Sequence, residues 1–135
     1  MADARPHVPD TEKITINLGL IDLGQIDLLV QEGFYSNRTD LIRTAIRNHL
    51  GTHADVLRQT VARRTLVLGL QAFTKRDLEA VRKARTKLRI QVLGLVRIAD
   101  DVTPALARET IESIVVLGAL HASPAVKAAL ADRID

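Results

Sequence analysis

The first clear pattern along the chain is the alternation of polar and apolar residues in Lys13-Ile14-Thr15-Ile16-Asn17-Leu18. This period of two predicts a short strand with one apolar face and one polar face. A lone strand exposes unpaired backbone groups and is not stable by itself. The next strand-like run follows only about 45 residues later. We therefore expect this strand to pair with the same strand of a second copy of the chain.

A helical pattern follows the strand directly. Asp22 stands where an N-cap is expected, and Gln25 lies three residues on, as in a capping box. Gly33 predicts the end of the helix, because glycine adopts the left-handed C′ conformation without strain. The apolar stripe of this predicted helix comprises Leu23, Ile26, Leu29 and Val30.

A second helical pattern begins at Ser36 or Asn37, which are both good N-caps. Gly51 is a candidate end, and residues 54–64 continue as a third helix or as an extension of the second. Phe34 and Tyr35 are expected to fill the junction between the first two helices. The apolar stripe of the second helix comprises Leu41, Ile42, Ala45, Ile46 and Leu50.

This order of strand, capped helix, glycine turn and capped helix resembles the ribbon-helix-helix family of DNA-binding proteins, of the MetJ, Arc and CopG type. The resemblance rests on the strand KITINL, on residues 33–40 and on LIRTAIRNHL, and it covers roughly residues 12–51. It implies an intertwined homodimer whose paired strands form a ribbon that enters the major groove of DNA. The resemblance does not extend to the second half of the chain.

The resemblance also assigns roles to residues of this sequence. Lys13, Thr15 and Asn17 become the base contacts, and their donors, acceptors and methyl group suit the edges of bases. The N-terminus of the second helix would bind phosphate. The expected phosphate contacts are Ser36, Asn37, Arg38 and Thr39. The expected dimer core comprises Ile14, Ile16, Leu18, Ile26, Leu41, Ile42, Ala45 and Ile46.

The second half of the chain contains three Val-Leu-Gly segments, whose glycines Gly69, Gly94 and Gly118 are 25 and 24 residues apart. Each apolar run leads through a polar stretch to a capped helical segment. The caps are Thr74 with Asp77, Thr103 with Pro104, and Ser123 with Pro124. The helices carry Leu78, Val81, Leu106, Val126 and Leu130 towards a core.

We therefore predict an α+β fold, with an N-terminal ribbon-helix-helix unit and a C-terminal repeat domain of short strands and helices. The middle strand, residues 88–98, is apolar on both faces near Gly94, so burial on both sides is expected. A domain this thin would gain from self-association. The predicted segments are a disordered arm over 1–11, the DNA-binding domain over 12–51, a helical connector over 52–64 and an oligomerisation domain over 65–135.

The amino-acid composition limits the kinds of chemistry that the chain can carry out. The chain has no cysteine, which excludes disulfides and thiol catalysis and is compatible with a reducing cytoplasm. No constellation of catalytic side chains, cofactor motif or membrane-spanning run is visible, so we expect no enzyme, no cofactor and no membrane association. His49 and His53 are four residues apart, but we interpret them as a polar helix end and not as a metal site.

The net charge of +3 suits a polyanionic partner without requiring one. The basic excess lies in the second half, and its densest run supplies further candidate phosphate contacts against the alternative of a solvated connection. These residues are Arg82, Lys83, Arg85 and Lys87.

The predicted function is a dimeric, sequence-specific transcriptional regulator, a repressor that binds double-stranded DNA in the cytoplasm, associated with the nucleoid. Two alternative interpretations remain. The first is an antitoxin-type DNA-binding protein with a protein partner. The second is a chromosome- or plasmid-organising protein that polymerises through its C-terminal domain into higher homo-oligomers.

Overall fold

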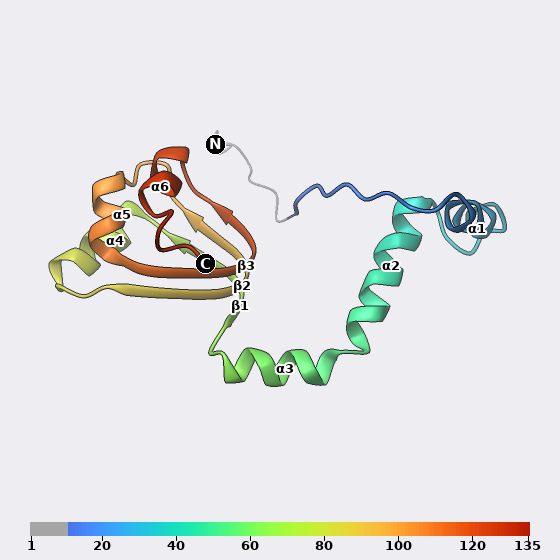
Figure 1. Ribbon diagram of the computed structural model, residues 1–135, viewed down its shortest axis with the longest axis horizontal. Helices are drawn as coiled ribbons and strands as arrows, with labels where there is room; N and C mark the ends of the chain where they lie inside the picture. Colours follow the sequence, from blue (N-terminus) through green and yellow to red (C-terminus); the bar gives the residue numbers. More distant parts are fainter. Residues whose placement is uncertain (1–10) are drawn as a thin grey trace, which may run out of the picture. The chain divides into compact units, whose positions relative to one another are not determined.

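The computed structural model describes residues 11–135 and divides them into two compact units, Thr11–Thr60 and Val61–Asp135 (Figure 1). The fold is α+β, with helices in both units and one three-stranded sheet in the second. The arm expected over residues 1–11 lies outside the described residues except for Thr11.

The first unit contains α1 (Leu20–Gln31), α2 (Arg38–Gly51) and most of α3 (Ala54–Arg63). Gly33 has a φ of 85° directly after the C-cap of α1, so the predicted glycine stop is confirmed. Of the two caps predicted for α2, Asn37 is the one used, and α2 ends at Gly51. The pattern after Gly51 is a separate third helix.

The predicted N-cap of the first helix was wrong. The helix begins three residues earlier than Asp22 would imply, with Gly19 as the N-cap and the Leu23 N–H donating to the Gly19 carbonyl oxygen at 3.0 Å. Leu20 and Ile21 occupy the first two helical positions, because the helix propensities of leucine and isoleucine allow it. Asp22 lies instead in the first turn, where a carboxylate is favoured by the helix dipole.

The segment Thr11–Gly19, which precedes α1, forms neither helix nor strand in the single chain. A strand is recognised by its hydrogen-bonded partner, and none of the described residues pairs with this segment. The expected pairing with a second copy therefore remains a prediction.

The second unit is built from three successive strand–helix pairs (Figure 1). The strands β1 (Val67–Phe73), β2 (Leu88–Ile98) and β3 (Ile111–His121) form a parallel sheet in the order β1-β2-β3. The helices are α4 (Lys75–Lys83), α5 (Pro104–Thr110) and α6 (Pro124–Ala129). The three predicted caps are all present, and Thr74 with Asp77 forms a complete capping box. The predicted middle strand matches β2 in both bounds.

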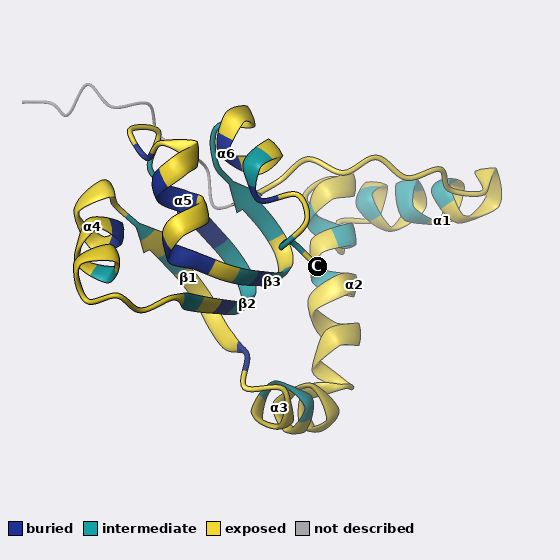
Figure 2. Ribbon diagram, turned by 60° about the vertical axis from the view of Figure 1, so that its left-hand side comes forward, coloured by how far each residue is buried: buried dark blue, intermediate teal, exposed yellow. Residues whose placement is uncertain are grey.

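The core lies between the sheet and the three helices. Four residues of β2 that face it are at most 2% exposed, namely Ile90, Val92, Val96 and Ile98, and the helices contribute Leu78, Leu106, Val126 and Leu130. Leu93 and Leu95, on the opposite face of β2, are only half-buried. The expectation that β2 is buried on both sides was therefore wrong for the single chain, because all three helices pack against the same face (Figure 2).

The three Val-Leu-Gly segments are aligned side by side in the sheet. Gly69 pairs with Gly94, and Gly94 pairs with Gly118. All three have positive φ, of 122°, 141° and 123° respectively. A Cβ on Gly94 would lie 2.1 Å from the Gly69 carbonyl oxygen, and a Cβ on Gly118 would lie 2.1 Å from that of Gly94. Only glycine allows this close approach.

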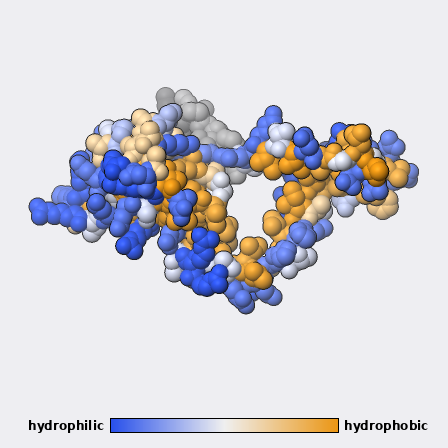
Figure 3. Space-filling model, viewed as in Figure 1, coloured by the Kyte–Doolittle hydropathy of each residue, from blue (hydrophilic) through white to orange (hydrophobic). Residues whose placement is uncertain are grey.

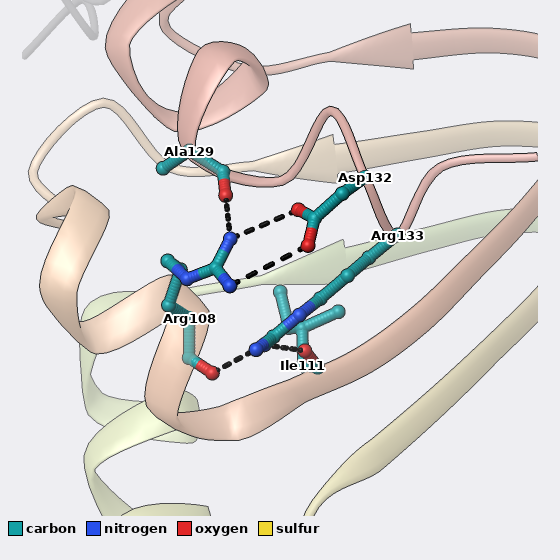
Figure 4. A network of polar contacts seen from close by, with 5 residues as sticks. All are labelled: Arg108, Ile111, Ala129, Asp132 and Arg133. Atoms are coloured by element: carbon teal, nitrogen blue, oxygen red, sulfur yellow. Dashed lines mark hydrogen bonds and ion pairs between the residues drawn. The ribbon is translucent and has the colours of Figure 1, made fainter.

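The end of the chain is bonded to the outer side of β3 (Figure 4). The Ile114 N–H donates to the Arg133 carbonyl oxygen at 2.9 Å, and the Asp135 N–H donates to the Ile114 carbonyl oxygen at 2.8 Å. The Arg133 guanidinium also donates to the carbonyl oxygens of Arg108 and Ile111, at 2.5 and 2.8 Å. Arg108 forms an ion pair with Asp132 at 2.9 Å. This network fixes the last residues against β3 and α5.

Candidate nucleic-acid interface

The residues expected to contact bases lie in the segment before α1. Lys13, Thr15 and Asn17 are all exposed, and so are the apolar residues between them. Ile14 is 76% exposed and Ile16 is 61% exposed. In the single chain, therefore, neither the polar nor the apolar side of this segment is covered by other described residues.

The residues expected to contact phosphate form the start of α2. The Asn37 side-chain oxygen accepts from the Asp40 N–H at 2.8 Å, and the Asp40 carboxylate accepts from the Ser36 N–H at 3.0 Å. These two bonds hold the first turn of α2 in a fixed geometry. Thr39, in the same turn, is exposed. The sequence prediction therefore named four residues that the structure brings together at one helix end.

Arg38, one of those four residues, already has a partner in the chain. Its guanidinium donates two hydrogen bonds to the Asp27 carboxylate of α1, at 2.7 and 2.8 Å. This hydrogen bonding lowers the pKa of Asp27 and raises the pKa of Arg38. Both side chains remain partly exposed, so a phosphate would compete with a carboxylate for the same guanidinium. No local sequence pattern predicts this pair, which spans the glycine turn.

A polar hollow of about 290 Å³ lies beside the same helix end. Asn37 and Thr39 line it together with Arg43 and Arg47, one and two turns further along α2. Their spacing of four residues places the two arginines on one helix face. Arg43 and Arg47 were not among the residues expected to contact phosphate, although their spacing of four residues was the signal that could have placed them beside the cap.

The basic run of the second unit is partly paired within that unit. Arg82 lies 3.7 Å from Glu109, and Arg89, which follows the run, donates to Glu112 at 3.0 Å. Lys83, Arg85 and Lys87 are exposed. Arg82 is therefore a weaker candidate for phosphate than its neighbours, because a carboxylate already offsets its charge.

The helices of the first unit leave their apolar stripes uncovered. No residue of α1, α2 or α3 is buried, as the yellow and teal ribbon shows (Figure 2). In the expected dimer core, Ile26, Leu41 and Ile42 are half-buried and Ala45 and Ile46 are exposed. Apolar side chains also gather over α1 and α2 in the space-filling view (Figure 3). An exposed group of apolar side chains of this size is typical of a protein–protein interface.

The two histidines of α2 and the following turn lie close together. The rings of His49 and His53 are 5.2 Å apart in an edge-to-face arrangement. Among residues 11–135, no group of three His, Cys, Asp or Glu side chains is placed to hold a metal ion. Nor does any helix in that part of the chain have the length and apolar character needed to cross a membrane.

Comparison with known protein families supports the class of protein that this geometry indicates. The model of the ribbon-helix-helix transcriptional regulator family matches residues 9–127. The chain belongs to this family, whose members are DNA-binding regulators that generally bind DNA as dimers and are generally not enzymes. The match continues far beyond the 12–51 segment that carried the resemblance, into the second unit. No curated protein and no solved structure matches the chain.

Proposed function

We propose that the chain is a homodimeric, sequence-specific repressor that reads the major groove with a two-stranded ribbon formed by residues 13–18 of both copies. In this arrangement Lys13, Thr15 and Asn17 point to base edges. Ile14 and Ile16 point the other way, between the helices of the two copies. Binding at an operator would then exclude the transcription machinery from the same DNA.

The observation that carries this proposal is the uncovered apolar surface of the first unit. Ile14 and Ile16 are mostly exposed, and Leu18 and Ile46 are 39% and 49% exposed in the single chain. Burying each such side chain contributes about 1.5–3 kcal/mol. A second copy, offering the same surface, supplies that burial and also the missing strand partner for residues 13–18.

The start of α2 would hold the dimer on the DNA backbone. The start of α2 carries the positive end of the helix dipole, and Asn37 fixes its first turn by accepting from the Asp40 N–H. Arg43 and Arg47, around the adjoining hollow, add positive charge on the same side of α2. Contacts of this kind position the protein without reading sequence.

The second unit would act in self-association and not in base reading. The residues expected to contact bases all lie in the first unit. By joining ribbon dimers, the second unit would raise occupancy at adjacent sites through effective concentration. The family match extends over residues 9–127 and so takes in most of the second unit.

The test is a selection of bound sequences from a random DNA pool, followed by affinity measurements on the selected site and on unrelated DNA. We expect Asn17→Ala to lose about tenfold to a hundredfold in affinity for the selected site, since one good base contact discriminates by about 1–3 kcal/mol. Affinity for unrelated DNA should change little, because backbone contacts remain.

The matched control is Asn48→Ala, which removes the same side chain from an exposed position of α2 outside the ribbon. It should leave the affinity for both DNAs unchanged. An equal loss on both DNAs in the Asn17 variant would contradict base reading by this residue.

A further inference from the structure

The second unit has an unusual free edge at β1. β1 pairs with β2 on one side only, and no described residue pairs with its other side. Edge strands in natural proteins are commonly protected by charges or proline. The sequence of β1, Val67–Phe73, is VLGLQAF and contains neither. Leu68 is 71% exposed and Leu70 is 53% exposed, so the edge is both open and apolar.

The apolar character continues across the outer face of the sheet. In register with Leu68 lie Leu93 and Leu117, and in register with Leu70 lie Leu95 and Ala119. In the space-filling view, orange side chains gather over the strands of this unit (Figure 3). A strand added beside β1 would therefore extend two existing apolar rows.

The glycine row shows that space is kept beside β1. A Cβ on Gly94 would strike the carbonyl oxygen of the strand before it, and the same is true of Gly118. A Cβ on Gly69 would meet nothing within 4 Å, because no strand precedes β1. Gly69 nevertheless has almost the same φ as Gly118. Because Gly69 has no side chain, the free edge of β1 stays open on the side where a further strand would pair.

The backbone of β1 also offers a donor at this edge. The Gly69 carbonyl oxygen lies close to Gly94, and so it points towards β2. In a trans peptide the carbonyl and the following N–H point in opposite directions, so the Leu70 N–H points to the free side. By the alternation of an extended strand, the Leu68 carbonyl oxygen points there too.

From these observations we infer that β1 pairs with β1 of a second copy, antiparallel and across a twofold axis at Gly69. Leu68 of each copy then lies opposite Leu70 of the other, and the Leu70 N–H donates to the Leu68 carbonyl oxygen across the axis. The register keeps apolar residues on the outer face of both sheets. The absence of charge in β1 removes the repulsion that two copies would otherwise bring to this contact.

A second copy is the occupant because the contact is small and a second copy is already close. A pair of seven-residue strands buries much less than the roughly 800 Å² per partner of a standard interface. It needs a tether, which the ribbon dimer supplies within one dimer and adjacent DNA sites supply between dimers, with an effective concentration of the order of millimolar. β1 begins four residues after the end of α3, directly beyond the DNA-binding unit in sequence. The inference thus rests on the proposed dimer.

The experiment measures hydrogen exchange of the amide at position 70 by NMR in the full chain, together with its mass in solution. The test variant combines Leu68→Lys with Leu70→Lys, which places like charges opposite each other in the proposed pair. Both positions are exposed in the single chain, so its fold should persist. We expect the amide to be protected in the wild type and to exchange at least about a hundredfold faster in this variant.

The matched control combines Leu117→Lys with Ala119→Lys, in the same two rows on β3. It should leave the protection unchanged, as should removal of residues 1–10. Loss of protection in the test variant together with a fall in mass from tetramer to dimer would place the contact between ribbon dimers. Loss of protection with an unchanged dimer mass would place it within one ribbon dimer.

Three results would overturn the inference. The first is free exchange of the Leu70 amide in the wild type. The second is equal loss of protection in the β3 control, which would indicate head-to-tail stacking of β1 on β3 or packing through the outer face. The third is loss of protection on removing residues 1–10, which would identify the chain's own N-terminus as the occupant. In each case the selection of DNA by Lys13, Thr15 and Asn17 is measured separately, so failure of this inference is distinguished from failure of the proposed function.

Discussion

The bidentate contact between Asp27 and Arg38 joins the end of one helix to the start of the next, directly at the expected phosphate site. It stabilises the turn through Gly33, but it also places a negative charge where a phosphate would arrive. In the proposed complex with DNA, Arg38 would exchange the Asp27 carboxylate for a phosphate.

This exchange gives a prediction about pH. The hydrogen bond from Arg38 lowers the pKa of Asp27 in the folded state, so the carboxylate contributes stability above its unfolded pKa of about 3.9. That contribution is lost as the pH falls through the lowered folded pKa. We expect Asp27→Asn to lower the melting temperature at pH 7, and the difference from the wild type to vanish near pH 2, in thermal unfolding followed by circular dichroism.

Asp22→Asn is the control, since Asp22 lies on the same helix and forms no ion pair with the described residues. Its effect should be smaller at pH 7. If the Asp27 variant loses as much stability at pH 2 as at pH 7, the ion pair is not the cause.

At the scale of single residues, contacts between neighbours along the chain could be predicted from the sequence. Asn37 was a candidate cap because side chains of its type accept from the N–H three residues on, and that bond is present. Asp27 and Arg38 are 11 residues apart across a turn, and no local rule joins them. The cap predicted at Asp22 was misplaced for a local reason, because aspartate is favoured both at the N-cap and in the first turn of a helix.

At the scale of the elements, the row of glycines explains how the three strands approach one another closely. The strands bend part-way along their length (Figure 1). The spacing of 25 and 24 residues in the sequence predicted a recurring unit, and each unit is a strand followed by a helix. The close approach of Gly94 to Gly69 could not be predicted, because it depends on the register between strands. The exposed outer face was missed because apolar residues on both faces of β2 suggested burial on both.

Gly94→Ala tests the close approach. The added Cβ would overlap the Gly69 carbonyl oxygen, and the positive φ is unfavourable for alanine. The conformational strain alone costs about 1–3 kcal/mol, and the overlap adds to it. We expect a clear fall in the free energy of unfolding, measured by urea titration with circular dichroism.

Gly24→Ala is the matched control, in α1 with nothing within 4 Å of its Cβ. It should stabilise the protein by roughly 0.5–1 kcal/mol, because alanine is the better helix former. Similar losses at both positions would refute the contact as the reason for glycine at position 94.

The two units of the chain differ in how far each buries its apolar residues. The first unit has little core of its own, whereas the second has a complete core under its sheet. The alternation in residues 13–18 predicts that a second copy completes the first unit, because a strand without a partner requires one from elsewhere. The dimer itself cannot be derived from one chain, since its contacts lie between copies.

A fragment of residues 1–64 tests this division. We expect it to form a dimer and to bind a single selected site nearly as well as the full chain. On DNA with two adjacent sites the full chain should gain about a hundredfold or more in affinity from linked binding, and the fragment should gain nothing. The measurements are mass in solution and quantitative binding to one-site and two-site DNA.

DNA carrying one selected and one scrambled site is the control, because it offers the same length without a second specific contact. A fragment that neither dimerises nor binds DNA would show that the two units do not work independently.

The backbone bonds from Arg133 and Asp135 to Ile114 make the two edges of the sheet unequal, because the outer edge of β3 has a backbone partner at Ile114 and the outer edge of β1 has none among the described residues. Antiparallel pairing of β1 with β1 uses the same edge of both copies and is closed, whereas joining β1 to β3 would leave an edge for each further copy and would build a fibre. In the proposed pairing the combined sheet therefore contains six strands, three from each copy.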